Sequence, residues 1–145
     1  MGFGVIDAKD GKYTLVGAGV IRTPANQALE LRLETIYSDL QEIIEEYEPD
    51  EAAVESIFFA QNVTTAISVS HARGVALLAI IQAKMDQSDY TPLQIKQAVT
   101  GYGRAEKKQM QEMVKTLLNL DTVPKPDDCA DALAAAICHA MTVGA

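Results

Sequence analysis

The 145-residue sequence lacks several features that would place it in a specialised class of protein. It has no tryptophan and only two cysteines, Cys129 and Cys138. Both fall in one expected helix, about 13 Å apart at the helical rise, which is too far for a disulfide within the chain. The longest apolar run, 74–81, is far shorter than the roughly 18 residues of a membrane span. No basic, apolar leader opens the chain, so we expect a cytoplasmic protein that is not in a membrane.

Basic residues are also scarce, with 12 Lys and Arg against 20 Asp and Glu and a formal net charge of −8. Taken alone, this balance argues against a nucleic-acid partner, because phosphate groups attract positive charge. The charge is unevenly distributed, however. Acid concentrates in 42–51, whereas 96–115 is mainly basic. The chain can therefore still present one basic face.

The composition that remains is that of an ordinary globular domain, with 48% hydrophobic and 22% charged residues. We expect residues 1–145 to form a single domain of the α/β class. Two β-rich runs flank an Asp-Gly turn signal, which predicts an antiparallel hairpin. Helical spacing follows, then a short buried strand that suits parallel pairing, and further helices. The expected strands are 2–7, 13–22, 51–56 and a brief one at 90–91; the expected helices are 28–48, 62–85, 92–99, 105–118 and 127–141.

Three acidic residues are of interest because they lie in or beside apolar segments, where a charge is not needed to keep the protein in solution. Glu55 ends an otherwise apolar strand, where a carboxylate needs a partner, water or a metal. Asp128 and Asp131 lie three residues apart and so share one face of the last helix. Each has a plain alternative: Glu55 pairs with a lysine, and the aspartates cap the helix and complement its dipole. Together they suggest a site for Mg²⁺, with Mn²⁺ as a substitute. His71 and His139 read as ordinary helix residues.

Five motifs in order resemble the RuvC family of bacterial Holliday-junction resolvases, endonucleases with an RNase H-like fold. They cover residues 55–62, 71–75, 91–99, 101–107 and 128–134. The resemblance implies a mixed sheet flanked by helices, and a homodimer that nicks a four-way DNA junction symmetrically. It also implies work alongside junction-binding and branch-migration motor proteins.

The same resemblance implies roles for individual residues. Glu55, Asp128 and Asp131 would be catalytic metal ligands, and Lys107 would be catalytic beside the scissile phosphate. Phe58 would stack on an opened base. The remaining residues expected to contact DNA are Lys96, Arg104, Lys108 and Arg73.

One departure from the family pattern is large. The family opens with a central strand that carries a Gly-Ile-Asp-Pro-Gly motif, whose Asp is a metal ligand. Here Met1 stands directly before the segment that follows that strand, and Asp7 is not a replacement by motif. We therefore expect unpaired strand edges beside the missing strand and impaired cutting by this chain. Two alternatives stay open: a junction-binding dimer that does not cut, and a metabolic α/β domain.

Overall fold

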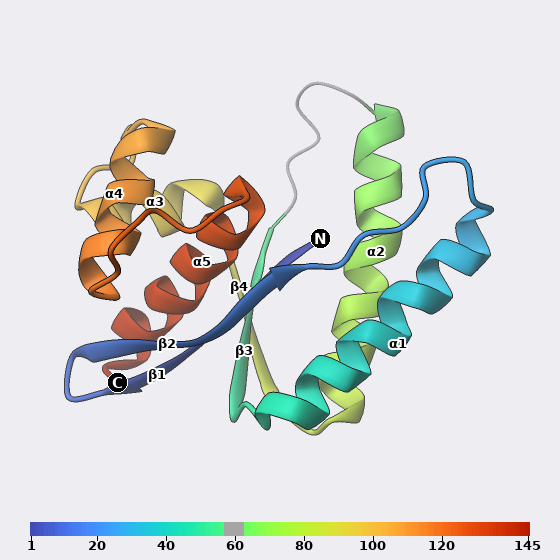
Figure 1. Ribbon diagram of the computed structural model, residues 1–145, viewed down its shortest axis with the longest axis horizontal. Coiled ribbons are helices and arrows are strands. Elements are labelled where there is room, and N and C mark those ends of the chain that lie inside the picture. Colours follow the sequence, from blue (N-terminus) through green and yellow to red (C-terminus); the bar gives the residue numbers. More distant parts are fainter. Residues whose placement is uncertain (57–62) are drawn as a thin grey trace.

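The fold was obtained as a computed structural model, which describes residues 1–56 and 63–145, with the backbone alone for 63–65. Its strands lie between one group of helices made of α3, α4 and α5 and a second group made of α1 and α2 (Figure 1). The elements are β1 (Gly2–Lys9), β2 (Lys12–Val20), α1 (Leu29–Tyr47), β3 (Glu51–Glu55), α2 (Val63–Gln82), β4 (Asp86–Tyr90), α3 (Pro92–Thr100), α4 (Lys107–Leu117) and α5 (Asp127–Val143).

These bounds confirm the order and type of elements expected from the sequence. The main difference is β4, which begins four residues before the predicted strand. Its sequence, Asp-Gln-Ser-Asp-Tyr, is polar and has no alternation, so periodicity alone does not reveal it. Parallel pairing with β3 supplies the backbone hydrogen bonds that hold it. None of the helices in the described part of the chain is long and apolar enough to cross a membrane.

The hairpin forms because its two-residue turn suits the twist of the strands. Asp10 and Gly11 both have positive φ, 53° and 75°, as a type I′ turn requires. Lys9 then pairs with Lys12, and the register runs back to Gly2 opposite Val20, with one irregularity after Val5.

The hairpin and the parallel pair are separate two-stranded sheets among the described residues. β1 pairs only with β2, and β3 pairs only with β4 within these ranges. This matches the expectation that the strands on either side of the family's first strand keep unpaired edges. The predicted mixed sheet is thus present as its two halves, which are not hydrogen-bonded to each other.

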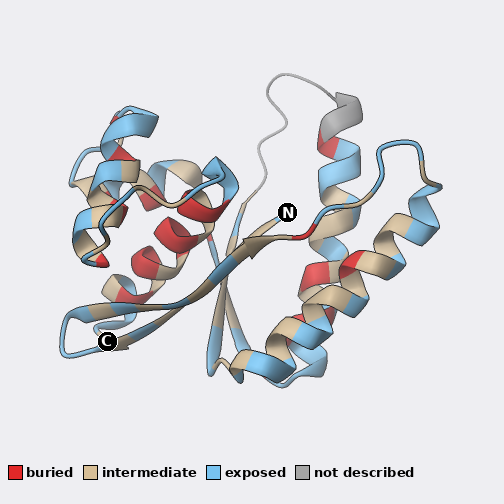
Figure 2. Ribbon diagram, viewed as in Figure 1, coloured by how far each residue is buried: buried red, intermediate tan, exposed pale blue. Residues whose placement is uncertain are grey.

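Helix α5 holds the structure together because it packs against the hairpin and against both strands of the parallel pair. Eight of its 17 residues are buried, and Leu133 and Ile137 are fully inaccessible to solvent. Figure 2 shows this concentration of buried residues on α5. Its small alanine side chains permit the close packing. β1 contributes glycines on the facing side: a Cβ on Gly2 would lie 2.3 Å from the carbonyl oxygen of Asp128.

Candidate active site

The candidate active site lies where β3 ends, near the beginning of α5. Glu55 is the last residue of β3, and Tyr90, the last residue of β4, is its partner in the parallel register. Asp131 lies in the second turn of α5 and is partly buried. The carboxylates of Glu55 and Asp131 are close enough to repel each other. The structure therefore brings together two of the three acids that the sequence selected.

Both carboxyl groups have pKa values above the ordinary range. Burial is the main cause for Glu55, and the negative charge of Asp131 adds to it, while Lys96 acts in the opposite direction. Burial also raises the pKa of Asp131, against the positive charge of Lys107, and Asp128 and Asp127 raise it further. Glu55 keeps an exposed side chain and Asp131 is half-buried. Carboxylates that repel each other are the kind of groups that a hard cation stabilises.

Asp128 occupies a different environment from Asp131. It is exposed in the first turn of α5. Its charge acts on Asp131, so it belongs to the same acidic surface. Among the described residues, however, no three His, Cys, Asp or Glu side chains converge closely enough to hold a metal ion. Glu55 and Asp131 fit a divalent cation by charge and donor type, but a cage of three carboxylates is not formed.

The alternative explanation of the aspartates holds in part. Pro126 is the N-cap residue of α5 and no side chain caps the helix, but Asp127 and Asp128 lie in its first turn, where their charges complement the helix dipole. Asp127 also accepts a hydrogen bond from Gln111 at 3.1 Å and forms an ion pair with Lys107, with 3.1 Å between Nζ and Oδ2. Asp127 was not among the residues selected from the sequence. Its acceptor role depends on how α4 packs against α5, which spacing does not reveal.

Two basic residues flank the pair of carboxylates from different helices. Lys96 lies on α3, and its charge lowers the pKa values of both Glu55 and Asp131. Lys107 is the first residue of α4, where its hydrogen bond to Asp127 and the charge of Asp131 raise its pKa. A lysine in this position is protonated at neutral pH and can neutralise a phosphate.

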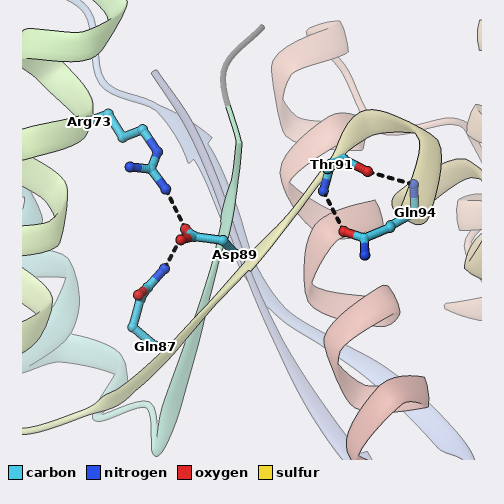
Figure 3. A network of polar contacts seen from close by, with 5 residues as sticks. All are labelled: Arg73, Gln87, Asp89, Thr91 and Gln94. Atoms are coloured by element: carbon cyan, nitrogen blue, oxygen red, sulfur yellow. Dashed lines mark hydrogen bonds and ion pairs between the residues drawn. The ribbon is translucent and has the colours of Figure 1, made fainter.

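The helix that carries Lys96 begins at a fixed point. Thr91 caps α3, and the Thr91 backbone N–H donates to Gln94 Oε1 at 2.8 Å while the Gln94 N–H donates to Thr91 Oγ1 at 3.1 Å. This reciprocal pair is a capping box, and Pro92 at the first helical position reinforces it (Figure 3). The direction of α3 is thereby set directly after β4.

The other predicted DNA contacts are in three different situations. Arg104 and Lys108 are exposed, on either side of the start of α4. Arg73 of α2 forms an ion pair with Asp89 of β4, which also accepts a hydrogen bond from Gln87 at 2.7 Å (Figure 3). The predicted stacking residue, Phe58, lies outside the described residues.

Histidine 139 is the residue that sequence reasoning undervalued. It does not behave as an ordinary helix residue, because its side chain is only 12% exposed and faces two polar groups. Its Nδ1 lies 2.7 Å from the hydroxyl oxygen of Tyr90. Its Nε2 lies 3.4 Å from a carboxylate oxygen of Glu51. The eight-residue spacing from Asp131 gave no indication of these contacts.

The chain is similar to known proteins of one family over nearly its whole length. The family model described as crossover junction endodeoxyribonuclease RuvC matches residues 1–139. The proteins of that name from Alkaliphilus oremlandii and Chloroflexus aurantiacus are 54% and 53% identical to this chain over 142 residues, covering 98% of it and 87% of each relative.

Solved structures extend the likeness to three dimensions. The RuvC of Thermus thermophilus in complex with a Holliday junction substrate is 34% identical, with a TM-score of 0.93, covering 98% of this chain and 87% of that one. Another structure of the same Thermus thermophilus protein has a TM-score of 0.90 at 33% identity, covering 99% and 88%. By sequence and by fold, this chain belongs to the RuvC family of crossover junction endodeoxyribonucleases.

Proposed function

We propose that this chain, as one nuclease domain over residues 1–145, binds four-way DNA junctions and hydrolyses phosphodiester bonds in them with a divalent cation. One observation carries the proposal: α5, which carries Asp131, packs against β3, which ends at Glu55, and the charges of Asp131 and Lys96 both act on Glu55. Lys107 acts in turn on Asp131. Neighbouring carboxylates near cations suit a metal ion and a phosphate side by side. The family relationship supplies the substrate, because a relative with this fold was solved with a Holliday junction substrate.

Each side chain of the site has a separate task in this proposal. Glu55 and Asp131, with Asp128 at the rim, hold Mg²⁺, which Mn²⁺ can replace. When bound, the ion supplies activation of the attacking water and stabilisation of the leaving oxygen. Lys107 neutralises charge on the scissile phosphate, as a lysine ammonium that is protonated at neutral pH can.

The DNA is held by basic residues on several elements. Lys96, Arg104 and Lys108 are proposed to contact phosphates from α3 and α4. Arg73 joins them once it exchanges Asp89 for a phosphate. Phe58 is proposed to stack on a base opened at the junction centre.

The active unit is proposed to be a homodimer formed through α2. Two symmetric nicks need two active sites related by a twofold axis. Helix α2 supports this because four apolar side chains on it stay exposed in the single chain. They are Ile67, Val69, Leu78 and Ile81, between 45% and 66% exposed. The other proposed partners of this chain are junction-binding and branch-migration motor proteins. The proposed location is the cytoplasm.

Cutting by these 145 residues is proposed to be weaker than in family members that carry the Gly-Ile-Asp-Pro-Gly strand. The aspartate of that motif is one of the expected ligands, and no three described acids converge without it. Asp7 is a poor substitute, because it is exposed and pairs with Thr14 towards the hairpin turn.

The test compares three proteins on a mobile four-way junction in Mg²⁺: the 145-residue chain, a version extended by the motif strand, and the same extension with Ala in place of its Asp. We expect the first and third to bind the junction in a gel shift but to cut several orders of magnitude more slowly than the second. Equal cutting by the first and second would mean that another acid takes the role of the missing ligand.

A matched set of substitutions tests the carboxylates. Asp131→Asn and Glu55→Gln in the extended protein should each reduce cutting by at least about 100-fold without weakening junction binding. Asp121→Asn replaces an exposed aspartate of the α4–α5 loop and should leave cutting unchanged. Wild-type cutting by the first two variants would refute their role as ligands.

A second function, junction binding without cutting, has one observation in its favour, namely that three carboxylates do not converge in the described part of the chain. Adding Mg²⁺ to the preformed complex of protein and junction distinguishes binding alone from cutting, since only a nuclease then releases nicked strands. Binding to the junction and to a linear duplex, measured over a range of salt concentrations, distinguishes both of these functions from a protein with no DNA partner.

A further inference from the structure

His139 on α5 faces a polar group on each strand of the parallel pair. The imidazole faces the Tyr90 hydroxyl at 2.7 Å and the Glu51 carboxylate at 3.4 Å, from opposite ring nitrogens. The rings of His139 and Tyr90 also meet edge to face, with centroids 5.7 Å apart and planes at 61°. Both residues are largely buried, with Tyr90 only 7% exposed. In such surroundings a polar contact is stronger and more directional than at the surface.

The Tyr90–His139 contact joins α5, which carries Asp131, to β4, the neighbour of the strand that carries Glu55. Tyr90 lies directly across from Glu55 in the parallel register. His139 lies eight residues after Asp131 on the same rigid helix, about 12 Å along its axis. The side-chain contact therefore links the two acids through a series of neighbours. Glu55 pairs with Tyr90 across the strands, Tyr90 contacts His139, and α5 connects His139 to Asp131.

This set of contacts matters because backbone hydrogen bonds do not fix the distance between Glu55 and Asp131. The hairpin, against which α5 packs most extensively, is not hydrogen-bonded to the parallel pair within the described residues. Apolar packing between α5 and the pair allows small sliding movements, whereas a hydrogen bond is lost when its atoms move by about 1 Å. Tyr90 also leads through Thr91 into α3, so the same contact fixes the start of the helix that carries Lys96.

We propose that His139 is a positioning residue of the active site, which holds Tyr90 so that Glu55 and Asp131 keep the separation needed for one divalent cation. The inference rests on the proposed metal-dependent function and deepens it. His139 does not touch the metal or the DNA in this scheme. It acts through the strands that it anchors.

The test measures metal binding and backbone protection separately, both on the full 145-residue chain. The variants are Tyr90→Phe, His139→Phe and the double variant, which remove the hydrogen bond but keep a ring in each place. His139→Gln retains a polar end that can still reach a partner. Tyr102→Phe removes a hydroxyl from an exposed tyrosine and serves as the matched control.

The first measurement is the Mn²⁺ concentration that gives half of the maximal rise in melting temperature. We expect Tyr90→Phe and His139→Phe each to raise this concentration by about 10-fold or more, as is usual when a group that orients a ligand is removed. The double variant should be no worse than the worse single variant, because both remove one contact. Gln should restore part of the loss, and the control should match the wild type.

The second measurement is hydrogen exchange of the amides of 51–56 and 86–90 without metal. Faster exchange in Tyr90→Phe and His139→Phe, but not in Tyr102→Phe, is expected. A wild-type metal midpoint in both ring variants would overturn the inference while leaving the proposed function intact. If Mn²⁺ does not stabilise even the wild type, the proposed metal site fails. The exchange result then decides whether His139 anchors the strands, and unchanged exchange refutes the inference.

Discussion

The two groups of helices differ in how completely they bury their apolar side chains. The group made of α3, α4 and α5 forms a continuous core, with Val114, Leu133 and Ile137 fully buried. The group made of α1 and α2 does not. Ile36 is the one buried residue of α1, a helix that lies wholly within the described range. Helix α2 leaves Leu78 and Ile81 about half or more exposed.

The comparison teaches that the two groups have different tasks. A group that hides its apolar side chains stabilises the single chain by itself. A group that leaves them in water gains stability only when another surface covers them. The candidate active site has one acid beside each group. Asp131 belongs to the well-packed α5, while Glu55 stands on the strand that precedes the exposed α2. Five predictions test this contrast.

The largest effect is expected from Leu133→Ala. Leu133 is fully buried on α5 and lies against Gly4, so truncation leaves a cavity in the core. The free energy of unfolding should fall by about 3 to 5 kcal/mol. Leu78→Ala on α2 should change it by about 0.5 kcal/mol or less in dilute protein. Urea denaturation measures both, and equal losses would erase the contrast between the two groups.

The next effect concerns association. Ile81 is 66% exposed on α2, and Ile81→Glu places a charge in the proposed dimer interface. The dimer dissociation constant should rise by about 100-fold, which corresponds to roughly 2.7 kcal/mol. Val143→Glu, at a half-exposed valine of α5, is the control. Analytical ultracentrifugation decides the matter, and a wild type that is monomeric at tens of micromolar contradicts the assignment.

A smaller effect is expected from two glycine substitutions with opposite signs. A Cβ on Gly2 meets the backbone of Asp128 at 2.3 Å, so Gly2→Ala should cost about 1 to 3 kcal/mol and displace the start of α5. A Cβ on Gly74 meets nothing within 4 Å, so Gly74→Ala should stabilise α2 by roughly 0.5 to 1 kcal/mol. Thermal melts that show the same sign for both would contradict this reading.

The fourth prediction concerns pH. The raised pKa of Asp131 means that the folded protein holds its proton more tightly than the unfolded chain does. The resulting stability is fully present below about pH 4, the ordinary carboxyl range, and is lost as pH rises through the raised value.

Asp131→Asn should therefore raise the melting temperature at pH 7 without metal. We expect a rise of about 1 to 3 °C, because solvent screens this partly exposed group. The gain should vanish near pH 3 and should reverse when Mn²⁺ stabilises the wild type alone. A gain of the same size at pH 3 would rule out ionisation of Asp131 as the cause.

The smallest effect is expected at the surface. Asp127 and Lys107 form an exposed ion pair, with side chains 59% and 56% accessible. Asp127→Asn should leave the melting temperature within about 1 °C of the wild type. Junction binding should tighten slightly, because Lys107 loses a competing anion. Weaker binding would indicate that Asp127 orients Lys107 rather than competing for it.

The sequence predicted the site better at some positions than at others. Glu55 stood out because a carboxylate ends an apolar strand, and the Asp128–Asp131 spacing identified one helix face. His139 could not be found this way, because its partners lie 49 and 88 residues away along the chain. Asp127 was missed for a similar reason, since its role depends on α4 meeting α5.

The amino-acid sequence by itself determined the family and the elements apart from most of β4. Local patterns suffice for this, because the Asp-Gly turn, the capping sequence before α3 and the helical periodicities act over a few residues. Only the tertiary structure decided how the acids are arranged. It brought the charge of Asp131 to bear on Glu55, left Asp128 exposed, kept the two strand pairs apart and placed His139 between Tyr90 and Glu51. These outcomes depend on packing between elements that are distant in the chain, and no local pattern records that packing.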